Sequence, residues 1–150
     1  MEVSYGRDRD VGVAEAGLMV LLEVCERAVE EMGSAVPPAQ LRALLVVDRV
    51  GGLNLGGLAR ALGASASATS RLIDRMQAGD LLTRDRAAVS RREIVLVPTE
   101  SGRRLAGWVR GQRRAALGGV LAAMSQAGGD ALARGLIEIA GQGLAQSSTD

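Results

Sequence analysis

Arginine is the side chain with which this chain is best equipped to bind a ligand. All eighteen basic residues among its 150 residues are arginines. Residues 55–114 contain twelve arginines and five acidic residues, whereas the rest of the chain contains six arginines and twelve acidic residues. The formal net charge of +1 therefore conceals a strongly basic middle segment. This segregation of charge predicts that the middle of the chain meets a polyanion.

The residues that most enzymes use for catalysis are missing or isolated. The sequence has no His and no Lys, and Cys25 is its one cysteine. It has no Gly-rich phosphate loop and neither an HExxH nor a GxSxG motif, so metal-dependent, Schiff-base and triad mechanisms lack their parts. The acidic residues recur at helical spacing, as on solvated helix surfaces. We therefore expect no catalytic activity, no metal and no cofactor.

The composition favours a small helical domain. Hydrophobic residues make up 47% of the sequence, yet it has one Trp, one Tyr and no Phe. The core must then be built from Leu, Val, Ala, Ile and Met, most of which suit helices. No apolar run is as long as the roughly 18 residues of a membrane span, and the N-terminus is charged where a signal peptide would be apolar. We expect a cytoplasmic protein.

Two short helices are predicted at the start of the basic segment. Asn54 can cap the first, and Gly63 can end it because glycine adopts the left-handed conformation without steric cost. Ser65 can cap the second helix, over residues 65–78. Helical spacing places four apolar groups on the inward side of this helix: the methyl of Thr69 and the side chains of Leu72, Ile73 and Met76.

The opposite side of this second helix is well suited to DNA. It carries Ser67, Ser70, Arg71 and Asp74, so small hydroxyls and alanines surround an arginine and the backbone can approach a partner closely. A major groove accepts such a helix, with the N-terminal residues of the helix at base edges. The alternative is an ordinary surface helix in a helical domain.

A β-hairpin is predicted after Gly79. Residues 81–84 and 92–97 have the pattern of two strands, and the charged connection 85–91 joins them. Four arginines lie on or beside this connection: Arg84, Arg86, Arg91 and Arg92. Pro98 ends the ladder, and Thr99 can cap a following helix. Two helices followed by a hairpin form a winged helix-turn-helix.

The remaining chain is predicted to be helical, so the fold class is mainly α with a small β-hairpin wing (α+β). The first long helix, predicted over residues 11–32, is apolar over most of its circumference, which indicates a subunit interface. The expected segments are a mobile arm over residues 1–10, helices over 11–32, 38–50 and 99–124, a break over 125–130, and a last helix over 131–144.

Several short motifs occur together in this chain: 38–41 (PAQL), 53–63 (LNLGGLARALG), 71–76 (RLIDRM), Gly79-x-Leu-Leu, Arg91-Arg92 before IVL, and Thr99-x-x-Gly102. Together they resemble the MarR family of bacterial transcription regulators. The chain departs from the family's usual pattern at Ser90, where Asp is common, at Pro98, where a hydrophobic residue is common, and at Ala68-Thr69, where Thr-Val is commoner.

The resemblance implies a homodimeric, sequence-specific DNA-binding regulator, most often a repressor, on a roughly palindromic operator. It implies one domain over 1–150, in which 37–100 form the winged helix-turn-helix flanked by dimerisation helices over 11–33 and 101–145. It also implies release by a small molecule, commonly a phenolic or aromatic acid. The alternative is a winged-helix protein–protein interaction module without specific DNA binding, which has no need of the basic middle segment.

The pattern and the resemblance assign residues to each role. The recognition helix contributes Ser65, Ala66, Ser67, Ser70, Arg71 and Arg75. The wing contributes Arg84, Arg86, Ser90, Arg91 and Arg92, and the candidate effector pocket contains Trp108, Val24 and Leu45. An ordinary core position is the simpler explanation of Trp108. The resemblance implies an ion pair between Asp74 and the wing residue Arg92. Side chains alternate along a strand, so Arg91 cannot share that partner. Arg84, Arg86 and Arg91 are therefore assigned to the phosphates and the minor groove.

Overall fold

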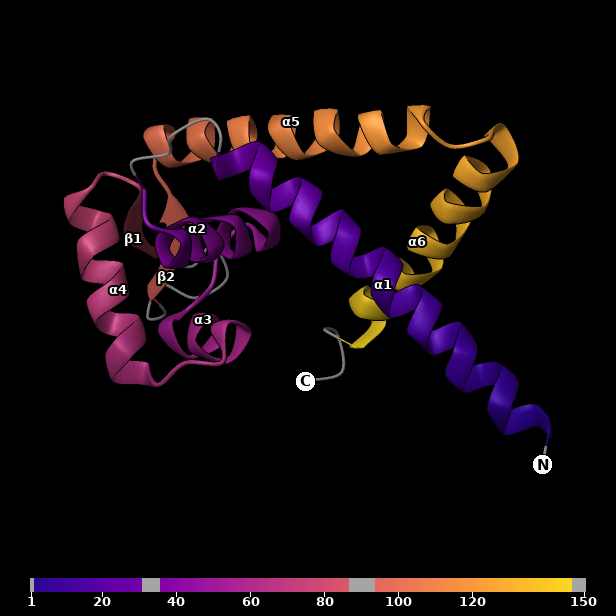
Figure 1. Ribbon diagram of the computed structural model, residues 1–150. Coiled ribbons are helices and arrows are strands. Elements are labelled where there is room, and N and C mark those ends of the chain that lie inside the picture. Colours follow the sequence, from indigo (N-terminus) through magenta and orange to yellow (C-terminus); the bar gives the residue numbers. More distant parts are fainter. Residues whose placement is uncertain (1, 31–35, 87–93, 147–150) are drawn as a thin grey trace. The chain divides into compact units, whose positions relative to one another are not determined.

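The computed structural model describes residues 2–30, 36–86 and 94–146 of the chain (Figure 1). It confirms a mainly helical fold with a small antiparallel hairpin. None of the described helices is both long enough and apolar enough to cross a membrane. In chain order the elements are α1 (Glu2–Glu30), α2 (Pro38–Val50), α3 (Leu55–Leu62), α4 (Ala66–Ala78), β1 (Leu82–Arg86), β2 (Ile94–Pro98), α5 (Glu100–Ala122) and α6 (Gln126–Gln146).

The chain divides into two compact units. Val29–Gln112, called the winged unit below, contains α2, α3, α4, the hairpin and the first half of α5. Met1–Ala28 and Arg113–Asp150, called the helical unit, contain most of α1, the rest of α5 and α6. The boundary therefore falls within α1 and within α5.

Local signals set the ends of the two central helices as predicted. The Asn54 side chain accepts a hydrogen bond from the backbone N–H of Gly57 at 2.8 Å, and this caps α3. Gly63 ends α3 in the left-handed conformation, with φ 64°. Ser65 then caps α4, because its hydroxyl accepts the N–H of Ala68 at 3.3 Å. Caps of this kind each contribute about 1 kcal/mol to helix stability.

The C-terminal end of α4 is a Schellman motif centred on Asp80. The N–H of Leu81 donates to the carbonyl of Met76 at 2.9 Å, and the N–H of Asp80 donates to the carbonyl of Gln77 at 3.1 Å. Asp80 has φ 53° and is the only non-glycine residue with positive φ among the described residues. Glycine usually occupies this position, and Leu81 and Met76 supply the apolar contact that accompanies the motif.

The hairpin pairs β1 with β2 in antiparallel register, from Leu82 opposite Pro98 to Arg86 opposite Ile94. Strand β2 also exchanges two backbone hydrogen bonds with the chain between α2 and α3: Leu53 N–H donates to the Leu96 carbonyl at 3.3 Å, and Leu96 N–H donates to the Leu53 carbonyl at 2.8 Å. Beside this bridge, Gly52 has φ 140°, a conformation that other residues rarely adopt. The wing is thus fastened to the helices at its base.

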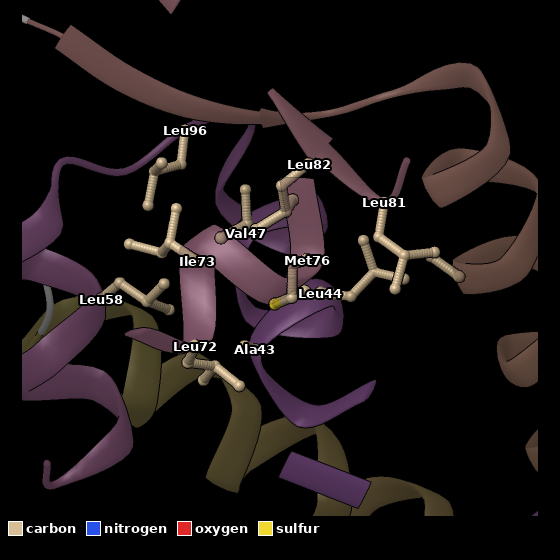
Figure 2. Close-up of a cluster of buried hydrophobic side chains, with 11 residues drawn as sticks. Ala43, Leu44, Val47, Leu58, Leu72, Ile73, Met76, Leu81, Leu82 and Leu96 are labelled. Atoms are coloured by element: carbon tan, nitrogen blue, oxygen red, sulfur yellow. The ribbon is translucent and has the colours of Figure 1, made fainter. Parts of the chain in front are cut away.

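The core of the winged unit gathers the inward faces of its elements (Figure 2). From α4 come Leu72, Ile73 and Met76, as the sequence predicts, and Thr69 is buried beside them. These side chains meet residues of α2, α3, the α4–β1 connection, the hairpin and α5, namely Ala43, Leu44, Val47, Leu58, Leu81, Leu82, Leu96 and Ala106. A second cluster joins Val29, Leu41 and Val109, with Trp108 and Leu45 packed against it while partly exposed.

The helical unit differs from two sequence predictions. Residues 2–10, expected to be a mobile arm, are the start of α1, which runs from Glu2. The break expected over 125–130 is shorter, and α6 begins at Gln126. The Ser125 hydroxyl accepts the N–H of Gly128 at 3.2 Å, and this cap starts the helix ahead of the two glycines.

Substitution of Gly102 tests how closely α5 approaches the end of α4. A Cβ at Gly102 would collide with the carbonyl oxygen of Leu81, which is backbone and cannot swing away. We expect Gly102→Ala to lower the free energy of unfolding by about 3 kcal/mol, at the upper end for overpacking. Urea denaturation measures the change.

Gly107→Ala is the matched control on the same helix. Its Cβ would meet only the end of the Arg110 side chain, at 3.9 Å, so alanine should stabilise α5 by up to about 1 kcal/mol. Equal effects of the two substitutions would show that the contact at Gly102 is not constraining.

Candidate nucleic-acid interface

The face of α4 that points away from the core is the main candidate surface. Ser67, Arg71 and Arg75 are exposed, and Ser70 is half-buried. They alternate with the buried residues Leu72, Ile73 and Met76 at helical spacing, so packing of one face presents the other. The outward side predicted from the sequence is therefore exposed, apart from the partial burial of Ser70.

The first turn of α4 is held by hydroxyl groups. The Thr69 hydroxyl donates to the Ser65 carbonyl at 2.9 Å, and the Ser65 and Ser67 hydroxyls lie 3.2 Å apart. Ser65 and Ala66 are both exposed. The Ser65 hydroxyl accepts the Ala68 N–H as the helix cap, and a hydroxyl has one donor and two acceptor positions, so Ser65 can contact a ligand while it keeps this cap.

Asp74 has a partner that the sequence did not assign to it. Arg84 of β1 donates to the Asp74 carboxylate at 3.1 Å, across a sequence separation of ten residues. The sequence assigned Arg84 to DNA phosphates and the minor groove, but this ion pair holds its guanidinium on α4. The expected partner Arg92 lies outside the described residues. The pair is half exposed, with 46% of the Arg84 side chain and 60% of the Asp74 side chain accessible.

Internal ion pairs occupy many arginines of the basic segment. Arg103 and Arg104 both pair with Glu100 in the first turn of α5, and Arg110 pairs with Asp48 of α2. Among the winged-unit arginines from 55 onward whose side chains are described, those without an ion pair are Arg60, Arg71 and Arg75. Among these described arginines, the positive charge that has no ion pair therefore lies on α3 and α4.

Arg60 was not singled out from the sequence. It is exposed in the last turn of α3, the helix that precedes α4. In helix-turn-helix proteins the first helix of the pair crosses the nucleic-acid backbone. Its place on that helix was the signal that could have identified it.

The remaining wing assignments are only partly described. Arg86 ends β1 opposite Ile94. Ser90, Arg91 and Arg92 lie outside the described residues.

The candidate effector residues are divided between the two units. Trp108 and Leu45 pack against the Val29, Leu41 and Val109 cluster of the winged unit, each while half-buried. Val24 belongs to the helical unit and is also half-buried. Trp108 thus makes the contacts expected of an ordinary core residue. Across the part of the chain that the structure describes, no three His, Cys, Asp or Glu residues are grouped as metal ligands.

Comparisons with known proteins agree with this geometry. The model of the MarR family matches residues 36–93. The chain is similar to the solved structure of RV1404 from Mycobacterium tuberculosis, with 26% identity and a TM-score of 0.74 over 89% of this chain and 91% of that one. It is equally similar to a MarR family protein from Bacillus stearothermophilus, with 26% identity and a TM-score of 0.73 over 95% and 98%.

A third solved structure shares the fold at lower identity. It is Streptococcus pneumoniae FabT in complex with DNA, with 15% identity and a TM-score of 0.63 over 95% of this chain and 98% of that one. No curated protein matches the chain in sequence.

A double-mutant cycle on Asp74 and Arg84 tests the ion pair. Since both groups are half exposed, we expect a coupling free energy of about 0.2–1 kcal/mol at low salt, smaller at high salt because ions screen the pair. Urea unfolding of Asp74→Ala, Arg84→Ala and the double variant measures it. The same cycle with Arg92→Ala tests the assignment made from the sequence, and coupling to Arg92 without coupling to Arg84 would contradict the pair described here.

Proposed function

We propose that this protein, a winged-helix transcription regulator of the MarR family, binds duplex DNA sequence-specifically as a homodimer, represses transcription and is released by a small molecule. The proposal has three parts, on DNA, on assembly and on the effector. Each part rests on a different observation.

The exposed face of α4 carries the proposal for DNA binding. Two arginines without an ion pair among the described residues, Arg71 and Arg75, project from a helix whose first turns bear only small side chains. An α-helix with this profile fits a major groove, and an arginine can bind guanine through two hydrogen bonds. FabT, which has the same fold, was solved with DNA. We assign Ser65, Ala66, Ser67, Ser70, Arg71 and Arg75 to this contact.

The wing and α3 would hold the protein on the DNA backbone. Arg60 on α3 and the wing arginines Arg86, Arg91 and Arg92 are the candidates for phosphate contacts. Arg84 joins them only when its pair with Asp74 opens. Contacts of this kind position a protein and make its affinity depend steeply on salt, whereas base contacts select the sequence.

The helical unit supports the proposal of a homodimer. No side chain described in residues 10–28 or 113–141 is buried. Its exposed apolar residues are Val11, Val13, Leu18, Met19, Val20 and Leu22 of α1, Leu121 of α5, Met124, and Leu136, Ile137 and Ile139 of α6. Exposed apolar surface on this scale marks an interaction site. A two-fold symmetric dimer would cover it and present two recognition helices to a roughly palindromic operator.

Trp108 makes the effector part of the proposal testable. It is the one tryptophan of the chain and is half-buried beside Leu45 in the second cluster, so an aromatic acid bound there would change its fluorescence. Saturable quenching by an aromatic acid, together with loss of DNA binding at the same concentrations, supports this part. Quenching without any effect on DNA binding contradicts it.

Selection of duplexes from a random-sequence library by the purified protein tests the central claim. We expect a shared, roughly palindromic motif. Arg71→Ala should weaken binding to the selected duplex by about 1–3 kcal/mol if Arg71 binds a base edge. Its affinity for a scrambled duplex should change less.

Arg42→Ala is the matched control for the loss of one exposed arginine, here from α2. An equal loss of operator affinity in the two variants would mean that Arg71 contributes only general charge. Failure of the wild-type protein to enrich any sequence would exclude specific DNA binding and favour a protein–protein module.

The assembly is tested by Ile137→Glu on α6. The Ile137 side chain is 71% exposed in the single chain, and a dimer that covers it would have to bury a carboxylate. We expect light scattering with size-exclusion chromatography to report a monomer for this variant and a dimer for the wild type. Glu138→Gln, one residue along, should remain dimeric. A dimeric Ile137→Glu protein would remove α6 from the interface.

A further inference from the structure

The turn that follows α4 is joined to the start of α5 by a set of polar contacts that neither the core nor the candidate DNA face uses. We call Asp80, Thr99, Ser101 and Gly102 the Asp80 junction. The Thr99 hydroxyl donates to the Asp80 carbonyl at 2.6 Å. The Ser101 hydroxyl donates to the Asp80 carboxylate at 2.8 Å. The backbone carbonyl and the side-chain carboxylate of Asp80 thus both accept hydrogen bonds from residues about twenty positions later in the chain.

Asp80 occupies a position where glycine would be less strained. Its φ of 53° places it in the left-handed region, while Gly79 directly before it has an ordinary φ of −86°. Left-handed non-glycine residues persist where the surrounding structure holds them, and they concentrate at functional sites. Aspartate has what glycine lacks here, a carboxylate that accepts the hydrogen bond from Ser101.

The α5 side of the junction is equally constrained. Thr99 also accepts the N–H of Gly102 at 3.0 Å, and its own N–H donates to the Leu81 carbonyl at 3.2 Å. Gly102 packs directly on that carbonyl, where a larger residue has no room. Arg104 donates to the Ser101 hydroxyl at 3.3 Å, so Ser101 is held from both sides. The start of α5 therefore offers a rigid platform to the end of α4.

From these contacts we propose that the Asp80 junction is a positioning device, which fixes the orientation of α4 for reading base sequence. This inference rests on the proposed DNA binding. The apolar contacts of Leu72, Ile73 and Met76 hold α4 on the core without strong directionality. Hydrogen bonds prescribe direction, and those of the junction secure the C-terminal end of the helix. Base contacts tolerate displacements of only about 0.5 Å, whereas long arginine side chains follow a moving phosphate.

Three variants separate positioning from stability. Ser101→Ala removes one hydrogen bond without a change of charge. Asp80→Gly removes the same bond from the other side but relieves the left-handed backbone, so it should unfold at an equal or higher urea concentration. Asp80→Asn keeps an oxygen acceptor and tolerates the left-handed conformation. Thr83→Ala, which removes an exposed hydroxyl from β1, is the control.

The readout is the ratio of affinities for the selected duplex and a scrambled duplex of the same length. We expect Ser101→Ala and Asp80→Gly to lower this ratio about fivefold, as for the loss of one hydrogen bond. Because both break one contact, their effects should not add in the double variant. Asp80→Asn and Thr83→Ala should keep the wild-type ratio within about twofold, inside the scatter of surface substitutions.

Hydrogen exchange provides a measurement without DNA. Ser101→Ala should speed amide exchange in residues 76–82, and Thr83→Ala should not. If Asp80→Gly is as stable as the wild type yet reads DNA less selectively, the positioning role is supported, since a purely structural role would not produce that combination. An unchanged ratio in Ser101→Ala and Asp80→Gly overturns the inference alone. A wild-type protein that selects no sequence overturns the proposed function, and this inference with it.

Discussion

Burial of one face of α4 is the constraint on which the winged unit depends. The large apolar side chains of Leu72, Ile73 and Met76 are buried, and each burial stabilises the fold by about 1.5–3 kcal/mol. They meet α2, α3 and the hairpin, so the helix that presents the candidate surface is also the centre of the core (Figure 2). Its outward face is free for binding because the inward face alone satisfies the packing.

Polar groups complete what apolar packing leaves open. Two caps define where α3 and α4 begin, and the ion pair of Arg84 with Asp74 ties the hairpin to α4. Pairing within the protein also redistributes charge. Glu100 and Asp48 neutralise arginines of α5, whereas Arg60, Arg71 and Arg75 keep theirs on the helix-turn-helix. Among these described arginines, the charge that has no ion pair therefore lies on α3 and α4.

The sequence predicted those features whose causes are local. Asn54, Gly63, Ser65 and the start of α2 at Pro38 are as expected, because caps, glycine stops and an initial proline act within a few residues. The partner of Asp74 and the left-handed Asp80 were not predicted, since Arg84 and Ser101 reach them across ten and twenty-one residues. Ser90, Arg91 and Arg92 lie outside the described residues, so those wing assignments remain predictions.

The two units differ in how far they bury their apolar side chains. The winged unit encloses its own core, whereas the described side chains of the helical unit enclose none. Helices without a packed face gain little stability from propensity alone. In the proposed dimer, the partner supplies the missing cover, so the stability of the helical unit depends on protein concentration. α5 belongs to both units and begins at the Asp80 junction. In these proposals, the same helix would therefore take part in dimerisation and in fixing the orientation of α4.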